Sequence, residues 1–153
     1  HEHALVVIGP EVEDTALAVL GELLADWRQR GSVPLVICGG NPARAGVAEL
    51  GEVVDLSLAA DAARPLGERL KALLRERLSW VDVVLLLAPH PDLVPALTEY
   101  LASQRRPWAP WIAATAEVRG MPIAHVLEGN LTDALQQAAE FVRNAQPYRW
   151  RFL

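Results

Sequence analysis

The sequence has little that would support covalent cross-linking or insertion into a membrane. Its single cysteine, Cys38, excludes an internal disulfide and is typical of proteins from a reducing compartment. The longest uninterrupted apolar run, Val83 to Pro89, is far shorter than the roughly 20 residues that a membrane-spanning helix needs. No charged and then apolar leader precedes the first apolar run, so we expect no secretory signal. These observations predict a cytoplasmic protein that does not span a membrane.

Positive charge is also scarce. The chain has 14 Lys and Arg residues against 19 Asp and Glu residues, which gives a formal net charge of -5. Adjacent or nearly adjacent basic pairs occur at Arg105-Arg106 and at Arg149 and Arg151, and these are too few to form a basic stripe. The charge balance therefore predicts partners other than nucleic acid or an anionic membrane surface.

The motifs that identify common cofactor and metal sites are missing from the sequence. It has no GxGxxG stretch, no Walker lysine after a glycine pair, no GxSxG elbow and no HExxH pair. The PHPD tetrapeptide, residues 89–92, resembles the PHPDDE loop of the zinc-dependent de-N-acetylases. The second aspartate of that loop is replaced here by Leu93, and the stretch lies in the middle of the chain. We therefore expect no metal site, and the cofactor, if any, is unknown.

The sequence is rich in apolar residues, which make up 52% of the chain and recur with two different periods. Short apolar runs predict strands at residues 4–8, 34–38, 53–58, 82–87, 111–115 and 123–127. Apolar residues at helical spacing predict helices at residues 12–30, 42–50 and 130–144. Two further helices are predicted between them, one that begins after Pro65 and one that ends at about Arg105. This alternation predicts a three-layer α/β/α sandwich with a mostly parallel sheet of five to six strands, Rossmann-like or flavodoxin-like.

The sequence leaves the direction of the last predicted strand open. About seven residues separate the runs 111–115 and 123–127, fewer than the dozen that a crossover between parallel neighbours usually takes. We therefore expect this strand either to pair antiparallel or to begin from an irregular loop. Residues 1–146 are expected to form one α/β domain, and residues 147–153 an aromatic and basic tail.

Ligands of open parallel sheets bind beyond the carboxyl ends of the strands, which directs attention to the stretch LVICGGNPARAG. Gly39 and Gly40 allow a turn that exposes backbone amides at the start of the next helix, where anions bind. Arg44 is placed to reach such an anion. Asn41 followed by proline also has the pattern of a helix cap, so a purely structural turn remains the alternative.

Two further strand ends carry candidate catalytic side chains. His90 follows the most apolar strand and lies between two prolines, and we expect Asp92 to cap the helix after it, with Pro95 at its third position. Glu128 follows the last strand and precedes Asn130, which is expected to cap the final helix. Both are candidates for general acid or base chemistry. The alternatives are that His90 is a solvated loop histidine and that Glu128 is an exposed carboxylate at a strand end. Cys38, at the end of the predicted strand 34–38, is expected to be a buried thiol.

Five tryptophans accompany only two phenylalanines and two tyrosines. In the tail, Tyr148, Trp150 and Phe152 alternate with two arginines, which has the period of a strand. Tryptophan, tyrosine and arginine are enriched where proteins bind each other. We expect the tail to add to a sheet edge or to pack on a partner subunit, and the alternative is a tail folded over its own core.

Two functions are compatible with this sequence. In the first, the protein binds a small anionic or phosphorylated metabolite at the carboxyl edge of the sheet, and whether His90 and Glu128 also catalyse a reaction is open. In the second, it is a non-catalytic assembly or regulatory subunit, in a homo-oligomer or a larger complex, that uses a tryptophan-rich apolar surface. A pocket joining Gly40, His90 and Glu128 favours the first function, and a large buried contact through tryptophans favours the second.

Overall fold

The computed structural model describes residues 3–39, 50–56, 64–104 and 110–150, with the side chains of residues 141–150 excluded. The described strands are β1 (His3–Ile8), β2 (Val33–Cys38), β3 (Val53–Asp55), β4 (Val83–Leu87), β5 (Trp111–Ala114) and β6 (His125–Val126). The described helices are α1 (Asp14–Gln29), α3 (Leu66–Arg77), the short 3₁₀ helix η2 (Pro91–Leu93), α4 (Val94–Ala102) and α5 (Leu131–Trp150). The helix expected at residues 42–50 lies almost entirely outside the described residues.

The six strands form one sheet in the order β3-β2-β1-β4-β5-β6, and every neighbouring pair is parallel. β1 lies at the centre, where Ile8 pairs with Cys38 of β2 on one side and with Leu87 of β4 on the other. The chain adds β2 and β3 on one side of β1 and then returns to add β4, β5 and β6 on the other. The strand order therefore reverses between β1 and β4.

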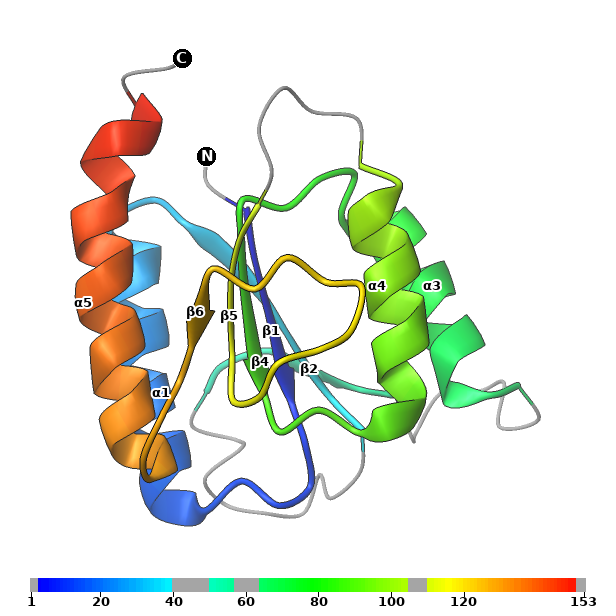
Figure 1. Ribbon diagram of the computed structural model, residues 1–153, viewed down its shortest axis with the longest axis horizontal. Helices are drawn as coiled ribbons and strands as arrows, with labels where there is room; N and C mark the ends of the chain where they lie inside the picture. The colour runs from blue at the N-terminus through cyan, green and yellow to red at the C-terminus, as the bar shows by residue number, and fades with distance from the viewer. Residues whose placement is uncertain (1–2, 40–49, 57–63, 105–109, 151–153) are drawn as a thin grey trace.

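Helices cover both faces of the sheet (Figure 1). α1 and α5 lie side by side on one face, and α3 and α4 lie side by side on the other. Alternate residues of β1 enter the two cores: Val6 and Ile8 pack on the α1 and α5 side, and Leu5 and Val7 pack on the α3 and α4 side. Because a central parallel strand is covered on both faces, its residues are apolar without alternation. The predicted three-layer α/β/α fold is confirmed.

Of the two alternatives for the last strand, antiparallel pairing is wrong, and the irregular loop before the strand is confirmed. β6 runs parallel to β5, with Ala113 opposite His125 and Ala114 opposite Val126. The two strands are only 4 and 2 residues long, so the connection 115–124 can return to the start of the sheet without a helix. Along the way Val118 and Ile123 pack on the α3 and α4 core, and Figure 1 shows this connection reaching across to α4.

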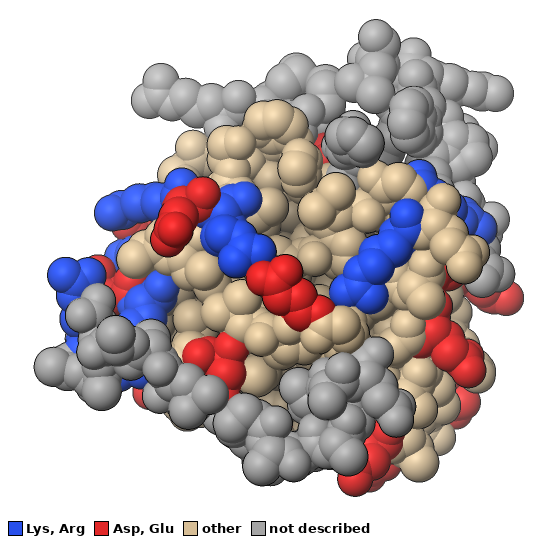
Figure 2. Space-filling model, turned by 180° about the vertical axis from the view of Figure 1, so that it is seen from behind, with Lys and Arg blue, Asp and Glu red and all other residues tan. Residues whose placement is uncertain are grey.

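Three arginines hold the short edge strand β3 in place. Arg28 of α1 donates to the Leu50 carbonyl before the strand at 2.9 Å, and Arg69 of α3 donates to the Leu56 carbonyl after it at 2.8 Å. Arg77 of α3 forms a 3.3 Å ion pair with Glu52. Figure 2 shows the side of the molecule opposite to the view of Figure 1. Basic and acidic side chains are interspersed across the middle of that side.

The chain ends in a long helix and not in a strand. α5 continues to Trp150, so the strand expected from the alternation in the tail is wrong for residues 147–150, and residues 151–153 lie outside the described part. Extending an existing helix by a turn costs less free energy than starting a new element, which explains why local alternation does not decide the structure here. Within the part of the chain that the structure describes, no helix is both long and apolar enough to cross a membrane.

Candidate functional site at the carboxyl edge of the sheet

The reversal of strand order places the ends of β1 and β4 next to each other at the carboxyl edge. Beyond β1 the chain leads to α1 on one face, and beyond β4 it leads to η2 and α4 on the other face (Figure 1). Diverging connections of this kind leave the crevice in which open α/β sheets bind ligands. The Gly9 amide donates to the Leu87 carbonyl at 2.9 Å, so the β1–β4 ladder continues one hydrogen bond past the strands, at the position where such a crevice is expected.

Ala88, which directly follows β4, is the strained residue at this position. Its φ of 45° lies in the left-handed region, which a residue with a Cβ atom rarely adopts. The Ala88 amide donates to the Thr115 hydroxyl at 2.8 Å, and Thr115 directly follows β5. A side chain from the next strand thus holds the turn that begins the His90 loop.

His90 caps the short helix η2, whereas the N-cap of α4, which the sequence predicted to be Asp92, is Leu93 without a side-chain cap. The His90 Nδ1 atom accepts the Asp92 amide at 3.1 Å, and α4 begins after Leu93 with Pro95 in its first turn. The expectation that Asp92 is the N-cap is therefore wrong. Because Nδ1 is an acceptor, a neutral His90 carries its proton on Nε2, which is then a hydrogen-bond donor. The side chain is about one-third exposed, at 33%.

Gly39, at the end of β2, lies close to the His90 loop. A Cβ atom placed on Gly39 would lie 3.9 Å from the His90 Cβ and 3.7 Å from a methyl carbon of Leu93. The ends of β2 and β4 therefore meet above β1, which separates the two strands in the sheet. The rest of the expected anion-binding loop, Gly40, Asn41 and Arg44, lies outside the described residues.

Glu128 lies at the same edge, two strands away from the strand that precedes His90. It is exposed and follows β6, which is two strands beyond β4. Two strand spacings amount to roughly 10 Å between the backbones at the two strand ends. The expected cap of α5 is present, because the Asn130 side chain accepts the Asp133 amide at 2.9 Å.

The remaining sequence candidates are mostly structural. Cys38 is buried, as expected. Among the tryptophans, Trp27 belongs to the core, Trp111 is half-buried, and Trp80 is exposed and forms an edge-to-face contact with His3 at the amino end of the sheet. Trp108 and the side chain of Trp150 lie outside the described residues. Among the tryptophan side chains that the structure describes, Trp80 is therefore the exposed one.

The roles of two residues of the site, Ala88 and Thr115, were not predicted from the sequence. An alanine at the end of an apolar run gives no sign of a positive φ, and a threonine after a strand gives no sign of its hydrogen-bond partner. Among the described residues, no three His, Cys, Asp or Glu side chains lie close enough together to hold a metal ion. Comparison with known protein families, with characterised proteins and with solved structures gives no match to this chain.

Proposed function

We propose that the protein binds a small metabolite with an anionic group at the carboxyl edge of the sheet, above β2, β1 and β4. The observation that carries this proposal is the contact distance between Gly39 and the His90 loop at the point where the strand order reverses. The strand order is that of Rossmann-like sheets, which bind ligands at this point. Because a fold alone does not define a function, the proposal depends on the residues found there.

The chemistry of these residues favours an anionic group on the β2 side. Gly39 has no side chain, so a ligand can approach the backbone, and the Nε2 proton of His90 can be donated to a ligand oxygen. The loop after β1 instead carries exposed Glu11, Glu13 and Asp14, which repel an anion from the start of α1. We assign Gly40, Asn41 and Arg44, which continue from Gly39, to binding of the anionic group.

His90 is also the residue that we propose for proton transfer, should the ligand react. Its Nδ1 atom accepts the Asp92 amide, so proton transfer through Nε2 requires this hydrogen bond to break and Nδ1 to take up a proton, which it can then donate to the Asp92 carboxylate 3.7 Å away. Glu128 is roughly 10 Å away by strand spacing and would contact the far end of a larger ligand. The proposed function is therefore ligand binding, with any reaction centred on His90.

Thermal unfolding with millimolar pyrophosphate, AMP or NAD⁺ tests the proposal. A ligand that binds the folded state raises the unfolding temperature, and at about 100 times its Kd it contributes about 2.7 kcal/mol. We expect at least one of these compounds to stabilise the wild-type protein. If none does, the proposed binding of pyrophosphate and of these nucleotides is wrong.

Variants then test the location. Gly39→Ala adds a methyl group at ordinary contact distance from His90 and Leu93, so the fold is retained while the approach to the backbone is blocked. We expect this variant and His90→Gln to lose most of the ligand-induced stabilisation. Glu128→Gln is the control at the far end of the same edge and is expected to keep the stabilisation produced by pyrophosphate. Equal stabilisation of wild type and Gly39→Ala would place the ligand elsewhere.

A further inference from the structure

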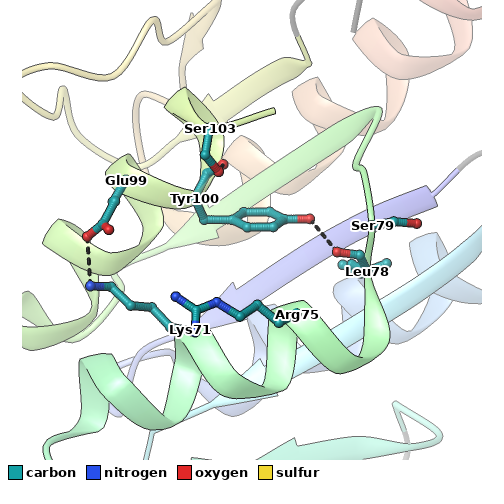
Figure 3. A pocket seen from close by; sticks show the side chains of 7 residues that line it. All are labelled: Lys71, Arg75, Leu78, Ser79, Glu99, Tyr100 and Ser103. Carbon is teal, nitrogen blue, oxygen red and sulfur yellow. Dashed lines mark hydrogen bonds and ion pairs between the residues drawn. The ribbon is translucent and has the colours of Figure 1, made fainter. Parts of the chain in front are cut away.

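A hollow of about 440 Å³ lies between α3 and α4, away from the carboxyl edge of the sheet. It is formed by the middle and end of α3, by the end of α4 and the residue after it, and by the residues that follow α3 toward β4 (Figure 3). This volume is within the range of about 300 to 1,000 Å³ that small-molecule sites occupy. The residues that line it are Lys71, Arg75, Leu78, Ser79, Glu99, Tyr100 and Ser103.

Part of the polar lining is already paired. The Lys71 ammonium forms a 2.7 Å ion pair with Glu99 across the two helices and a 3.6 Å ion pair with Glu68 on its own helix. The hydrogen bond from Lys71 lowers the pKa of Glu99, and the same bond raises the pKa of Lys71. Both groups are therefore charged near neutral pH. The Ser103 hydroxyl donates to the Tyr100 carbonyl at 2.8 Å.

Tyr100 supplies a fixed aromatic wall. Its hydroxyl donates to the Leu78 carbonyl at 3.1 Å, which holds the side chain across the space between α4 and the end of α3 (Figure 3). Burial raises the pKa of Tyr100, so the phenol is neutral near physiological pH. A ring held at both ends offers a surface for a flat apolar group without losing further side-chain entropy on binding.

Arg75 is the cation of the hollow that makes no close contact of its own, although its charge helps to lower the pKa of the Glu99 carboxyl. It is exposed, and it forms no hydrogen bond or ion pair within 4 Å with any residue that the structure describes. Its guanidinium lies beside Lys71 and near the Tyr100 ring (Figure 3). The Ser79 hydroxyl, at the other end of the hollow, is likewise not engaged by a described residue. The lining itself thus holds two cations against the single carboxylate of Glu99, and Glu68 lies beside Lys71 outside the lining.

We propose that this hollow binds a small organic acid, whose carboxylate pairs with Arg75 and whose flat apolar part packs on the Tyr100 ring. A guanidinium pairs with a carboxylate through two parallel hydrogen bonds, which suits a single unpaired arginine. A phosphate dianion fits less well, because its second charge would face the Glu99 carboxylate. The site is separate from the carboxyl edge of the sheet, and the proposal stands whether or not a ligand binds there.

Titration with phenylacetate, followed by amide chemical shifts of the ¹⁵N-labelled protein, tests this proposal. We expect saturable shifts in residues 71–79 and 99–103, and none with phenylacetamide, which has the same shape without the charge. Arg75→Gln is expected to weaken phenylacetate binding by about tenfold, because charge-assisted hydrogen bonds are the strong ones. Arg119→Gln makes the same change at another exposed arginine and is expected to leave the affinity unchanged.

The tyrosine separates the two parts of the proposed site. Tyr100→Phe keeps the ring and is expected to keep most of the affinity, whereas Tyr100→Leu removes the ring and is expected to weaken binding severalfold. Three results would overturn the proposal: no saturable shifts in these segments, equal binding of phenylacetate and phenylacetamide, or unchanged affinity of Arg75→Gln. Because none of these measurements involves Gly39 or His90, they do not depend on the proposed function.

Discussion

Gly9 lies directly against the backbone carbonyl of Ala88, so closely that a Cβ atom on Gly9 would be 1.6 Å from that oxygen. This contact joins the turns after β1 and β4 at the point where the strand order reverses. It is permitted only by the hydrogen atom of glycine. The floor of the candidate ligand crevice therefore depends on backbone packing. A side chain at position 9 would clash with backbone, and no small movement of a neighbouring side chain could relieve that clash.

Gly9→Ala is accordingly expected to be strongly destabilising. Because the clash is with backbone and not with a flexible side chain, the turns must move apart, and we expect a loss of about 3 kcal/mol or more in the free energy of unfolding. Gly39→Ala is the matched control, since its added methyl group meets only ordinary contacts, and it is expected to change stability by less than about 1 kcal/mol. Urea denaturation of both variants measures the difference. Similar stabilities would show that the Gly9 contact is not a constraint.

The layers of this fold could be predicted from the sequence because burial acts through periodicity. Strand β4 reads as an unbroken apolar run since both of its faces are covered, and α3 carries buried leucines at helical spacing. The direction of β6 could not be predicted in this way. A parallel β6 requires the chain to return from the end of β5 to the level at which β6 begins. This distance is short because the two strands have only 4 and 2 residues, and the composition does not reveal these lengths.

The side chain of Arg69 is expected to stabilise the edge strand β3 more than that of Arg77. Arg69 donates to the Leu56 backbone carbonyl at 2.8 Å in a partly buried setting, whereas Arg77 pairs with an exposed Glu52. We expect Arg69→Met to cost about 1 to 2 kcal/mol and Arg77→Met about 0.5 kcal/mol or less. Equilibrium unfolding in urea compares the two. Equal losses would show that the hydrogen bond to the Leu56 carbonyl contributes no more stability than the exposed ion pair does.

The candidate site was only partly accessible from the sequence. The parallel sheet makes it possible to assign Gly39 and His90 to one edge, because strand ends of the same direction meet there. The cap at His90 was missed because the short helix η2 was not predicted from the sequence, and because aspartate is a commoner cap than histidine. The separation of Glu128 from His90 depends on strand order, which local patterns do not encode.

Tyr100 is expected to ionise later than an unperturbed tyrosine when the pH is raised. Burial raises its pKa above the ordinary value of 10.0, so the folded state holds this proton more tightly than the unfolded state. The resulting stability is fully present below about pH 10 and is lost as the pH rises through the folded-state pKa. The chain has two tyrosines, so absorbance of tyrosinate during a pH titration should show a late component. Tyr100→Phe should remove that component, and its persistence would assign it to Tyr148.

The hydroxyl of Thr115 is expected to hold the turn that presents His90. It accepts the Ala88 amide at 2.8 Å, and Ala88 is the residue with the strained φ. Thr115→Val keeps the shape of the side chain but leaves this amide without its acceptor, which should cost about 1 to 3 kcal/mol of stability. Thr115→Ser retains an acceptor and is expected to lose less. If the proposed function is correct, Thr115→Val also weakens ligand-induced stabilisation at a temperature where the variant remains folded, because the His90 loop loses its anchor. Equal stability of the valine and serine variants would show that the Ala88 turn is held by other contacts.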